Sequence, residues 1–278
     1  MRIDGHTEII AHIGYPTHSF KSPLIYNPWF ERAGANVLVV PMGCRAPDYA
    51  AFLKSVFSLS NIRGALITMP HKVSTIELVD DLLPAAQIAG ACNAVRRMDD
   101  GRLQGDMFDG EGFVRGVRRK GLVLPGARAL VVGNGGVGCA IAASLAAAGV
   151  ATIGLHDVNR ASSEGLGQRL RQHYPRLLVS TGSSDPAGWD LVVNATPMGM
   201  EEGDPLPLDV SRLSAASFVG EVVMKAETTA FLAAAKARGC RVQVGSDMLF
   251  EQIPAYLEYF GLPSTTPEQL REVAQLGD

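Results

Sequence analysis

The chain has 278 residues, of which 47% are hydrophobic and 19% charged, and its formal net charge is −3. This length accommodates two domains of ordinary size, and the composition is typical of a globular α/β protein. The balanced charge offers no field that would attract nucleic acid or an anionic membrane, so neither is expected as a partner. The first residues lack the apolar core of a signal peptide, and no apolar stretch reaches membrane-spanning length without a glycine turn or a charge. We therefore expect a cytoplasmic protein.

Cysteine and histidine residues show no spacing that is typical of a metal site. The four cysteines lie far apart, and the six histidines are likewise scattered. Isolated thiols of this kind are expected to be small buried apolar side chains in a reducing compartment. The sequence therefore predicts no bound metal, and it predicts histidines that are structural or exposed, with His71 as an exception because it is next to Lys72.

The N-terminal third alternates between apolar strands and helical segments. Short strands are expected at 8–13, 36–40 and 64–69, and a helical run at 47–59. Ser22-Pro23 combines a helix cap with a proline at the first helical position, which predicts a helix ended by Gly34. This alternation favours a parallel sheet with crossover helices. Further strands at 92–97 and 102–104 flank Asp99-Asp100-Gly101, a predicted hairpin turn.

The stretch 129–149 contains the most informative motif of the chain. An apolar run is followed by a glycine turn, 133–138 (GNGGVG), and then by small helix-forming residues. In this strand, turn and helix context, Gly133 permits the turn, Gly135 lets a pyrophosphate approach the backbone, and Gly138 lets the helix lie close to the strand. The free amides at the helix N-terminus then bind the phosphates. The motif predicts a dinucleotide-binding domain.

The remainder of the chain continues this pattern. Helices are expected at 111–120, 162–173 and 228–238, strands at 151–155, 191–194, 218–223 and 241–244, and two further helices at 248–260 and 267–276. Together these elements predict a doubly wound domain preceded by a smaller open α/β domain, with the substrate held between the two beside the nicotinamide.

Four polar residues are candidates for chemistry on their position alone. Asp157 ends the strand after the glycine turn, where an acid binds the adenosine ribose and repels the extra phosphate of NADP; the alternative is a helix cap or a solvated acid. Lys72 follows a strand end and could donate to a carbonyl that accepts hydride, although most lysines are simply solvated. Asp109 is either an N-cap or the partner of a lysine, and Asn93 either a turn residue or a ligand for hydroxyl groups.

Seven segments occur together in an order that resembles the shikimate dehydrogenase family over nearly the full length of the chain. They are Gly14-Tyr15-Pro16 with Lys21-Ser22-Pro23, Thr68-Met69-Pro70-His71-Lys72, Gly90-Ala91-Cys92-Asn93, Asp109-Gly110, Gly133–Gly138, Asn194-Ala195-Thr196-Pro197-Met198-Gly199-Met200, and Gly245-Ser246-Asp247-Met248-Leu249-Phe250-Glu251-Gln252. The resemblance implies reversible reduction of 3-dehydroshikimate to shikimate, or of a related cyclic hydroxy acid such as quinate. It also implies a nicotinamide cofactor and a monomer or homodimer.

The resemblance further implies the roles of individual residues. Lys72 and Asp109 would form the catalytic pair, in which Lys72 polarises the ketone and Asp109 orients the lysine and binds a hydroxyl. The implied substrate-binding residues are Ser22, Thr68, Asn93, Gln252 and, as an altered position, Phe20. The implied cofactor-binding residues are Gly133, Asn134, Gly135, Gly136, Val137, Gly138, Asp157, Asn194, Ala195, Thr196, Met198 and Gly245. The implied domains are 1–110 with 246–278 for the substrate and 111–245 for the cofactor.

The chain also departs from the family pattern at several polar positions. Phe20 stands where the family usually has a serine, Leu66 replaces an asparagine, and Met107-Phe108 replaces Asn-Thr. A substrate oxygen left without its partner loses about 1–3 kcal/mol, so an altered substrate pocket is expected. On the cofactor side, Asp157-Val158-Asn159 replaces the Asn-Arg-Thr of members that use NADP, which favours NAD and leaves NADP as the alternative.

Two other functions stay open at this point. One is a non-catalytic NAD-binding redox sensor, which would keep Gly133–Gly138 but has no need for both Lys72 and Asp109. The other is a dehydrogenase for an unrelated hydroxy acid on the same fold. Phe20 and Leu66 favour it, whereas the retained polar residues Ser22, Thr68, Asn93 and Gln252 argue against it.

Overall fold

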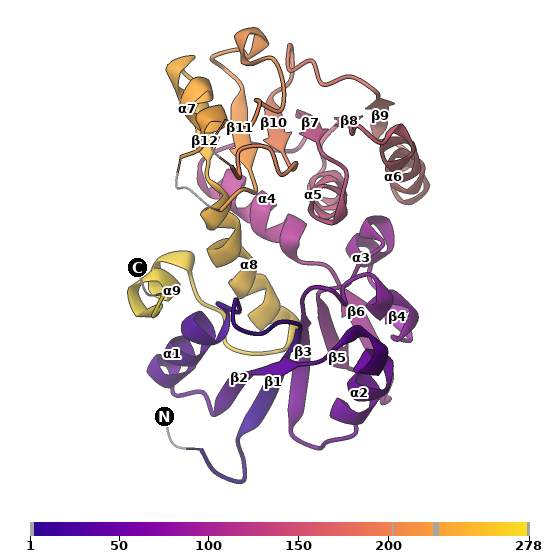
Figure 1. Cartoon of the computed structure of the whole chain (residues 1–278), viewed down its shortest axis with the longest axis vertical. Coiled ribbons are helices and arrows are strands. Elements are labelled where there is room, and N and C mark those ends of the chain that lie inside the picture. The colour runs from indigo at the N-terminus through magenta and orange to yellow at the C-terminus, as the bar shows by residue number, and fades with distance from the viewer. Residues whose placement is uncertain (1–2, 202, 225–227, 277–278) are drawn as a thin grey trace. The chain divides into compact units, whose positions relative to one another are not determined.

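The computed structural model describes residues 3–201, 203–224 and 228–276, and its contacts divide the chain into two compact units. Unit 1 comprises Met1–Phe108 with Ile253–Asp278, and unit 2 comprises Asp109–Gln252 (Figure 1). Because the boundary falls within one helix, α8 (Gly245–Tyr259), the two units share that element. The predicted division into a substrate-binding domain, 1–110 with 246–278, and a dinucleotide-binding domain, 111–245, stays a prediction.

Unit 1 is built on a mixed six-stranded sheet with the order β2-β1-β3-β5-β6-β4. Its strands are β1 (Glu8–Gly14), β2 (Val37–Gly43), β3 (Ile62–Ile67), β4 (Asp81–Leu82), β5 (Ala94–Arg97) and β6 (Leu103–Asp106). β1 pairs in parallel with both β2 and β3, as the alternation of strands and helices predicts. β5 and β6 form the expected antiparallel hairpin, and Gly101 in its turn has a φ of 86°.

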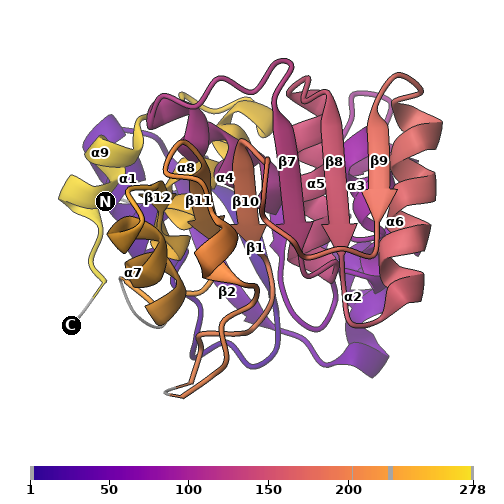
Figure 2. The ribbon, with the colours of Figure 1, turned by 90° about the horizontal axis from the view of Figure 1, so that it is seen from above.

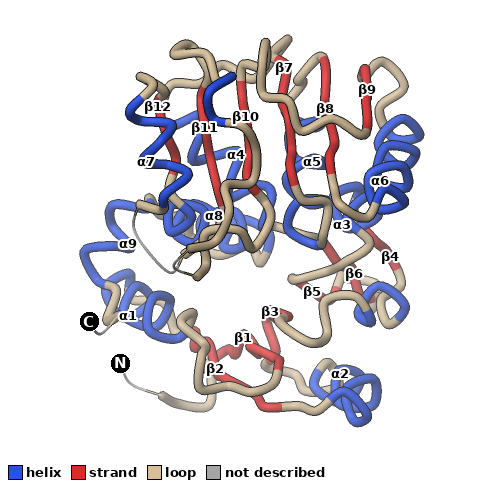
Figure 3. The backbone as a smooth tube through the Cα atoms, turned by 45° about the horizontal axis from the view of Figure 1, so that its top comes forward, coloured by secondary structure: helices blue, strands red, loops and turns tan. Residues whose placement is uncertain are grey.

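Helices cover both faces of this sheet. They are α1 (Pro23–Ala33), α2 (Tyr49–Val56), α3 (Pro84–Ala89), the end of α8, and α9 (Pro267–Val273). α1 begins after Ser22 and ends at Gly34, whose φ is 65°, both as predicted. α2 is shorter than expected because its first turn, Ala46–Asp48, is a 3-10 helix. α9 packs against α1, so the C-terminal helices return to the first part of the chain, as the resemblance implied (Figure 3).

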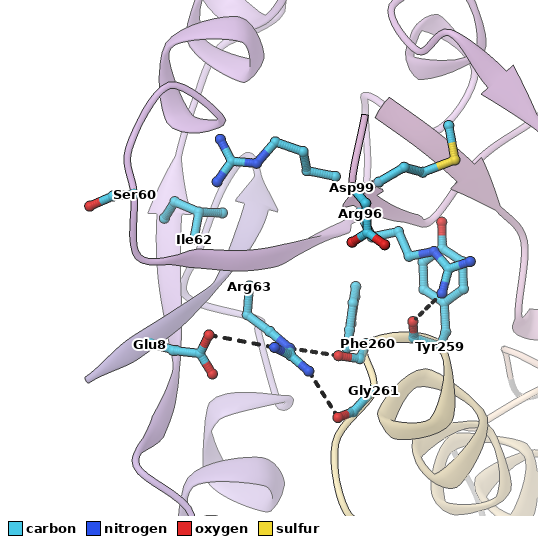
Figure 4. A pocket seen from close by; sticks show the side chains of 11 residues that line it. Glu8, Ser60, Ile62, Arg63, Arg96, Asp99, Tyr259, Phe260 and Gly261 are labelled. Atoms are coloured by element: carbon cyan, nitrogen blue, oxygen red, sulfur yellow. Dashed lines mark hydrogen bonds and ion pairs between the residues drawn. The ribbon is translucent and has the colours of Figure 1, made fainter. Parts of the chain in front are cut away.

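Two arginines attach the C-terminal end of α8 to the sheet of unit 1 (Figure 4). Arg63 donates hydrogen bonds to the carbonyls of Phe260 (2.6 Å) and Gly261 (2.9 Å). Arg96 donates to the carbonyl of Tyr259 (2.8 Å) and lies 4.5 Å from the centre of its ring. Since the last carbonyls of a helix lack partners within the helix, these guanidinium groups satisfy them and complement the helix dipole.

Unit 2 contains a fully parallel sheet with the order β12-β11-β10-β7-β8-β9. Its strands are β7 (Arg128–Val132), β8 (Thr152–His156), β9 (Leu178–Thr181), β10 (Leu191–Asn194), β11 (Phe218–Glu221) and β12 (Arg241–Gln243). Counted from β7, this is the order 3-2-1-4-5-6 of the Rossmann fold, which places the switch of direction between β7 and β10. The predicted doubly wound domain is therefore confirmed.

Both faces of the parallel sheet are covered by helices (Figure 2). These helices are α4 (Asp109–Arg119), α5 (Gly136–Ala147), α6 (Arg160–His173), α7 (Ala230–Ala237) and the start of α8. α4 and α5 pack closely because Gly110 has no side chain, and a Cβ there would overlap the Ala140 carbonyl. α7 covers the opposite face with a core that includes Phe231 and Leu232. Among the described residues, no helix is long and apolar enough to span a bilayer.

Candidate active site

The glycine turn of unit 2 lies between β7 and α5, and its backbone requires glycine at two positions. Gly133 has a φ of 91°, and a Cβ there would lie 2.6 Å from the Ala195 carbonyl carbon. A Cβ on Gly138 would overlap the Gly133 carbonyl oxygen, so the helix can approach the strand only because this residue is glycine. Gly135 and Gly136 have nothing within 4 Å of their Cβ positions. The turn therefore leaves an open approach to the N-terminal amides of α5, which fits a phosphate group.

Asp157 directly follows β8, and its side chain forms a hydrogen bond with the backbone of the glycine turn. Its two carboxylate oxygens accept hydrogen bonds from the backbone amides of Asn134 (2.6 Å) and Asn159 (2.8 Å). The side chain is thereby fixed at the carboxyl end of the sheet, and each oxygen keeps a further lone pair. Asn134 itself is 4% exposed, and its Oδ1 lies buried without a partner among the described residues.

The residues that directly follow Asp157 in the sequence provide little fixed positive charge. Val158 is fully exposed beside it, and the next basic residue, Arg160, forms an ion pair of 2.7 Å with Glu164. To bind a 2′-phosphate, Arg160 would have to give up its ion pair with Glu164. That pair is exposed and contributes little stability.

The segment after β10 is organised by a buried asparagine. Asn194 is completely buried, and its Oδ1 accepts hydrogen bonds from the amide (3.0 Å) and the hydroxyl (2.6 Å) of Thr196. Its Nδ2 donates to the Met198 carbonyl at 3.1 Å. The side chain of Asn194 thus shapes the loop that contains Ala195. At the neighbouring strand, Gly245 begins α8 against the backbone of Val223, where a Cβ would not fit.

Two predicted substrate residues lie at the ends of unit 2 in the sequence. Asp109 begins α4 and is 6% exposed, so the expected helix at 111–120 starts two residues earlier. Gln252 is the last residue of the unit, and its Oε1 is buried without a partner among the described residues. This oxygen can therefore still accept a hydrogen bond.

In unit 1 the predicted residues gather at the carboxyl ends of β1 and β3. The amide of Thr68 donates to the Ile13 carbonyl (2.9 Å), which continues the pairing of the two strands. Lys72 follows four residues later, and its carbonyl accepts a hydrogen bond of 2.8 Å from the Cys92 amide. Because open α/β sheets place ligands at the carboxyl ends of their strands, both side chains stand where a ligand is expected. The intervening His71 is structural, since its ring stacks on Tyr49 at 3.9 Å.

Ser22 and Asn93 complete the predicted set in this unit. Ser22 occupies the N-cap position of α1, but its hydroxyl makes no capping hydrogen bond. Asn93 is 2% exposed, and its Oδ1 accepts from the Phe108 amide at 2.9 Å. The remaining polar group of that side chain, the NH2, can only donate. Lys72 and Asp109 belong to different units, so their pairing stays a prediction.

Phe20 packs over Gly14 at the end of β1. A Cβ on Gly14 would lie 2.9 Å from the Cζ of Phe20 and would overlap the methyl group of Thr68. The Phe20 ring also stacks on the imidazole of His12, with 4.1 Å between ring centres and 28° between ring planes. An aromatic ring therefore lies where the family resemblance expected a hydroxyl, and it is fixed by contacts on two sides.

Sequence reasoning overlooked His12, which was grouped with the structural or exposed histidines. It is 7% exposed, and its Nδ1 is buried without a hydrogen-bond partner among the described residues. Its pKa is lowered from 6.5 to about 4, mainly by burial and to a smaller extent by the positive charge of Lys72. The available signal was a single polar side chain within the apolar run 9–14, two residues before the Gly14-Tyr15-Pro16 segment.

The strand order of unit 2 and the geometry of its glycine turn define a Rossmann-fold protein that carries a second, open α/β unit. Comparison with known proteins then gives the family. A model of the shikimate dehydrogenase substrate binding domain matches residues 12–95. The chain is 36% identical over 255 residues to shikimate dehydrogenase (NADP(+)) of Rubrobacter xylanophilus, covering 90% of this chain and 89% of that relative. The chain belongs to the shikimate dehydrogenase family.

Solved structures agree with this assignment. Shikimate 5-dehydrogenase from Listeria monocytogenes, in complex with shikimate and NAD, is 26% identical with a TM-score of 0.91, and the similarity covers 98% of each chain. Quinate dehydrogenase from Corynebacterium glutamicum, in complex with NAD, is 28% identical with a TM-score of 0.84, covering 96% of this chain and 98% of that one. The resemblance that the sequence segments suggested is therefore confirmed at the level of family and fold.

Proposed function

We propose that the chain is a dehydrogenase that transfers hydride reversibly between a nicotinamide cofactor and a cyclic hydroxy acid of the shikimate or quinate type. The names of the relatives support the reaction class. The observation that carries the proposal for this chain is the position of Lys72 and Thr68 at the carboxyl edge of unit 1, in a chain whose unit 2 has an open glycine turn.

The proposed roles follow from the chemistry of the side chains. Lys72 polarises the ketone and takes part in the proton transfer, while Asp109 orients the lysine and binds a substrate hydroxyl. Ser22, Asn93 and Gln252 bind the hydroxyl and carboxylate oxygens, which is consistent with the non-capping hydroxyl of Ser22 and the unpaired Oε1 of Gln252. The cofactor, when bound, supplies or accepts the hydride. The amides of Gly135 and its neighbours at the start of α5 hold its phosphates.

NAD is the proposed cofactor, with NADP as the weaker alternative. Asp157 places a carboxylate at the strand end where the ribose binds, Val158 offers no positive charge, and Arg160 is paired with Glu164. A 2′-phosphate would be repelled by the carboxylate and would find no arginine in position. The Rubrobacter relative is named for NADP(+), whereas the Listeria and Corynebacterium structures hold NAD. Both nicotinamide cofactors therefore occur among the similar proteins.

A dehydrogenase for a cyclic hydroxy acid with a less polar edge is the second candidate. It is favoured by Phe20 over Gly14 and by Leu66, which is 4% exposed, because neither can replace the polar side chain that the family pattern has there. The two candidates share the cofactor site and the catalytic pair, and they differ only in the substrate that fits unit 1.

The deciding experiment is a panel of shikimate, quinate and amino-substituted analogues, each assayed with NAD and NADP by the absorbance of the reduced cofactor. Lys72→Ala is expected to lower kcat by about 100-fold or more on the preferred substrate, as the loss of a proton-transfer group does. Lys54→Ala, a lysine on α2, is the control and should leave kcat unchanged. Near wild-type turnover by Lys72→Ala would show that the catalytic assignment is wrong, and no turnover with any pair would reject the dehydrogenase proposal.

A further inference from the structure

His12 is a buried polar residue of unit 1 to which the proposed function assigns no role. It lies in β1, in register with Leu66 of β3, so the two side chains share one face of the sheet. Gly14, two residues further along, is on the same face, and there Phe20 and Thr68 come together. His12 is therefore part of the wall formed by Phe20, Thr68 and Leu66 at the carboxyl edge of unit 1.

The absence of a hydrogen-bond partner at Nδ1, among the described residues, indicates the tautomer of this imidazole. Nδ1 is buried without a partner among the described residues, and an unpaired N–H is a rarer state in protein interiors than an unpaired lone pair. We therefore assign the proton of the neutral ring to Nε2. Since burial and the Lys72 charge keep the pKa near 4, the ring is neutral and a hydrogen-bond donor throughout the physiological range.

The contact with Phe20 holds the ring in one orientation. The two rings are stacked with 4.1 Å between centres, and Phe20 is itself seated over Gly14. A fixed ring loses little conformational entropy when a ligand binds, so a donor held in this way is pre-organised. Position 20 lacks the hydroxyl of the family pattern, and the aromatic ring that stands there stacks on His12, two positions before Gly14.

We propose that His12 is a substrate-recognition residue whose Nε2–H donates a hydrogen bond to an oxygen of the cyclic hydroxy acid, in place of the hydroxyl that Phe20 lacks. This inference rests on the proposed function, because it concerns the substrate of the same site. Phe20 positions the donor and closes one side of the pocket with an apolar surface. Substrate selection in this chain then depends on His12 and Phe20 together.

The test compares three variants of the full-length protein. His12→Val removes the donor with a residue that is well suited to a strand, and His12→Gln restores an N–H at similar reach. Ile10→Val on the same face of β1 is the control for a small loss of packing. Circular dichroism and thermal unfolding establish that each variant folds.

The expected result is a change in substrate binding alone. His12→Val should raise the KM of the preferred substrate and the Kd of shikimate or quinate, measured by calorimetry, by about tenfold. The kcat and the KM of the cofactor should stay within about threefold, and His12→Gln should recover most of the loss. Ile10→Val should remain within about twofold of wild type.

The outcomes separate this inference from the function on which it rests. Equal Kd values for wild type and His12→Val would overturn the inference while leaving the dehydrogenase proposal intact, and so would an equal loss in Ile10→Val. Binding of shikimate or quinate that depends on His12, without turnover, would overturn the dehydrogenase proposal and leave the recognition role standing. Absence of binding of either compound to the wild type would overturn both.

Discussion

The proposed ligand-binding edges of the two units are constructed by different means. In unit 2 the turn at Gly133 and Gly138 is determined by the backbone, which allows no side chain at either position. In unit 1 the corresponding edge is determined by side chains, with Phe20 stacked on His12 above Gly14. A site made by backbone geometry resists substitution, whereas a site made by side chains can change its ligand without changing its fold. The glycine turn accordingly keeps the family motif, whereas Phe20 and Leu66 depart from the family pattern.

The largest expected effect comes from placing a methyl group in the glycine turn. Gly138→Ala forces a Cβ onto the Gly133 carbonyl, so the turn and the α5 contact must shift together. We expect a loss of about 3 kcal/mol in the free energy of unfolding and no measurable cofactor binding. Urea unfolding and a titration with NAD check both, and a variant with wild-type stability would show that the backbone constraint is wrong.

Gly135→Ala is the matched control within the same turn. Its Cβ position has nothing within 4 Å, and its φ of −74° suits alanine, so stability should stay within about 0.5 kcal/mol of wild type. The methyl group would nevertheless stand in the approach to the α5 amides, and NAD binding should weaken by about tenfold. Wild-type affinity in this variant would place the phosphates elsewhere.

A second effect is expected from acid, and it concerns the wall of unit 1. The pKa of His12 is about 4 in the folded protein, whereas an unperturbed histidine in the unfolded chain has a pKa of 6.5. Between these two pH values the unfolded chain therefore binds more protons than the folded protein. Stability contributed by the neutral ring is fully present above pH 6.5 and is lost as the pH falls through 4, by up to about 3 kcal/mol.

His12→Val isolates that contribution from the carboxylates, which titrate in both proteins. The difference in unfolding free energy between wild type and variant should therefore shift by about 2–3 kcal/mol in favour of the variant between pH 7 and pH 4.5. Urea unfolding at the two pH values measures it. Parallel pH curves would mean that His12 titrates normally in the folded state.

The parts of the fold that followed from the sequence are those with strong local signals. Ser22-Pro23 and Gly34 gave both ends of α1, and the glycine turn indicated the parallel unit, because cap and turn residues act within a few positions. β9 was missed because its residues are mostly exposed and carry no apolar alternation, and α3 because six residues are too few for helical periodicity.

The sequence predicted which segments contribute candidate residues to the site, because short motifs identify them. The segments of Lys72 and Asp109 could be found from the order of motifs, but which side chains contact each other depends on packing between distant segments. Asn194 illustrates the limit, since its buried side chain organises the loop at Thr196 through hydrogen bonds that no spacing reveals. His12 is a second example, because its stacking contact with Phe20 could not be predicted from the sequence.

A third prediction restores the family residue in the substrate wall. Phe20→Ser replaces the ring with a hydroxyl, which provides a partner for a substrate oxygen and should lower the KM for shikimate by about tenfold. Phe20→Leu, which shrinks the side chain without adding a polar group, is the control and should give no such gain. If both variants bind shikimate equally well, the effect of Phe20 is steric and the polar argument is wrong.

The smallest expected effect concerns Asp157, to which we attribute the proposed preference for NAD. Asp157→Asn removes the charge but keeps an oxygen that can accept from the amide of Asn134, so the turn should remain folded. Two charges about 4 Å apart in water interact by about 1 kcal/mol, so loss of the repulsion should raise the ratio of kcat/KM for NADP to that for NAD by about fivefold. Asp157→Glu keeps the charge and should not raise the ratio. A rise in both variants would mean that charge repulsion by this carboxylate does not select the cofactor.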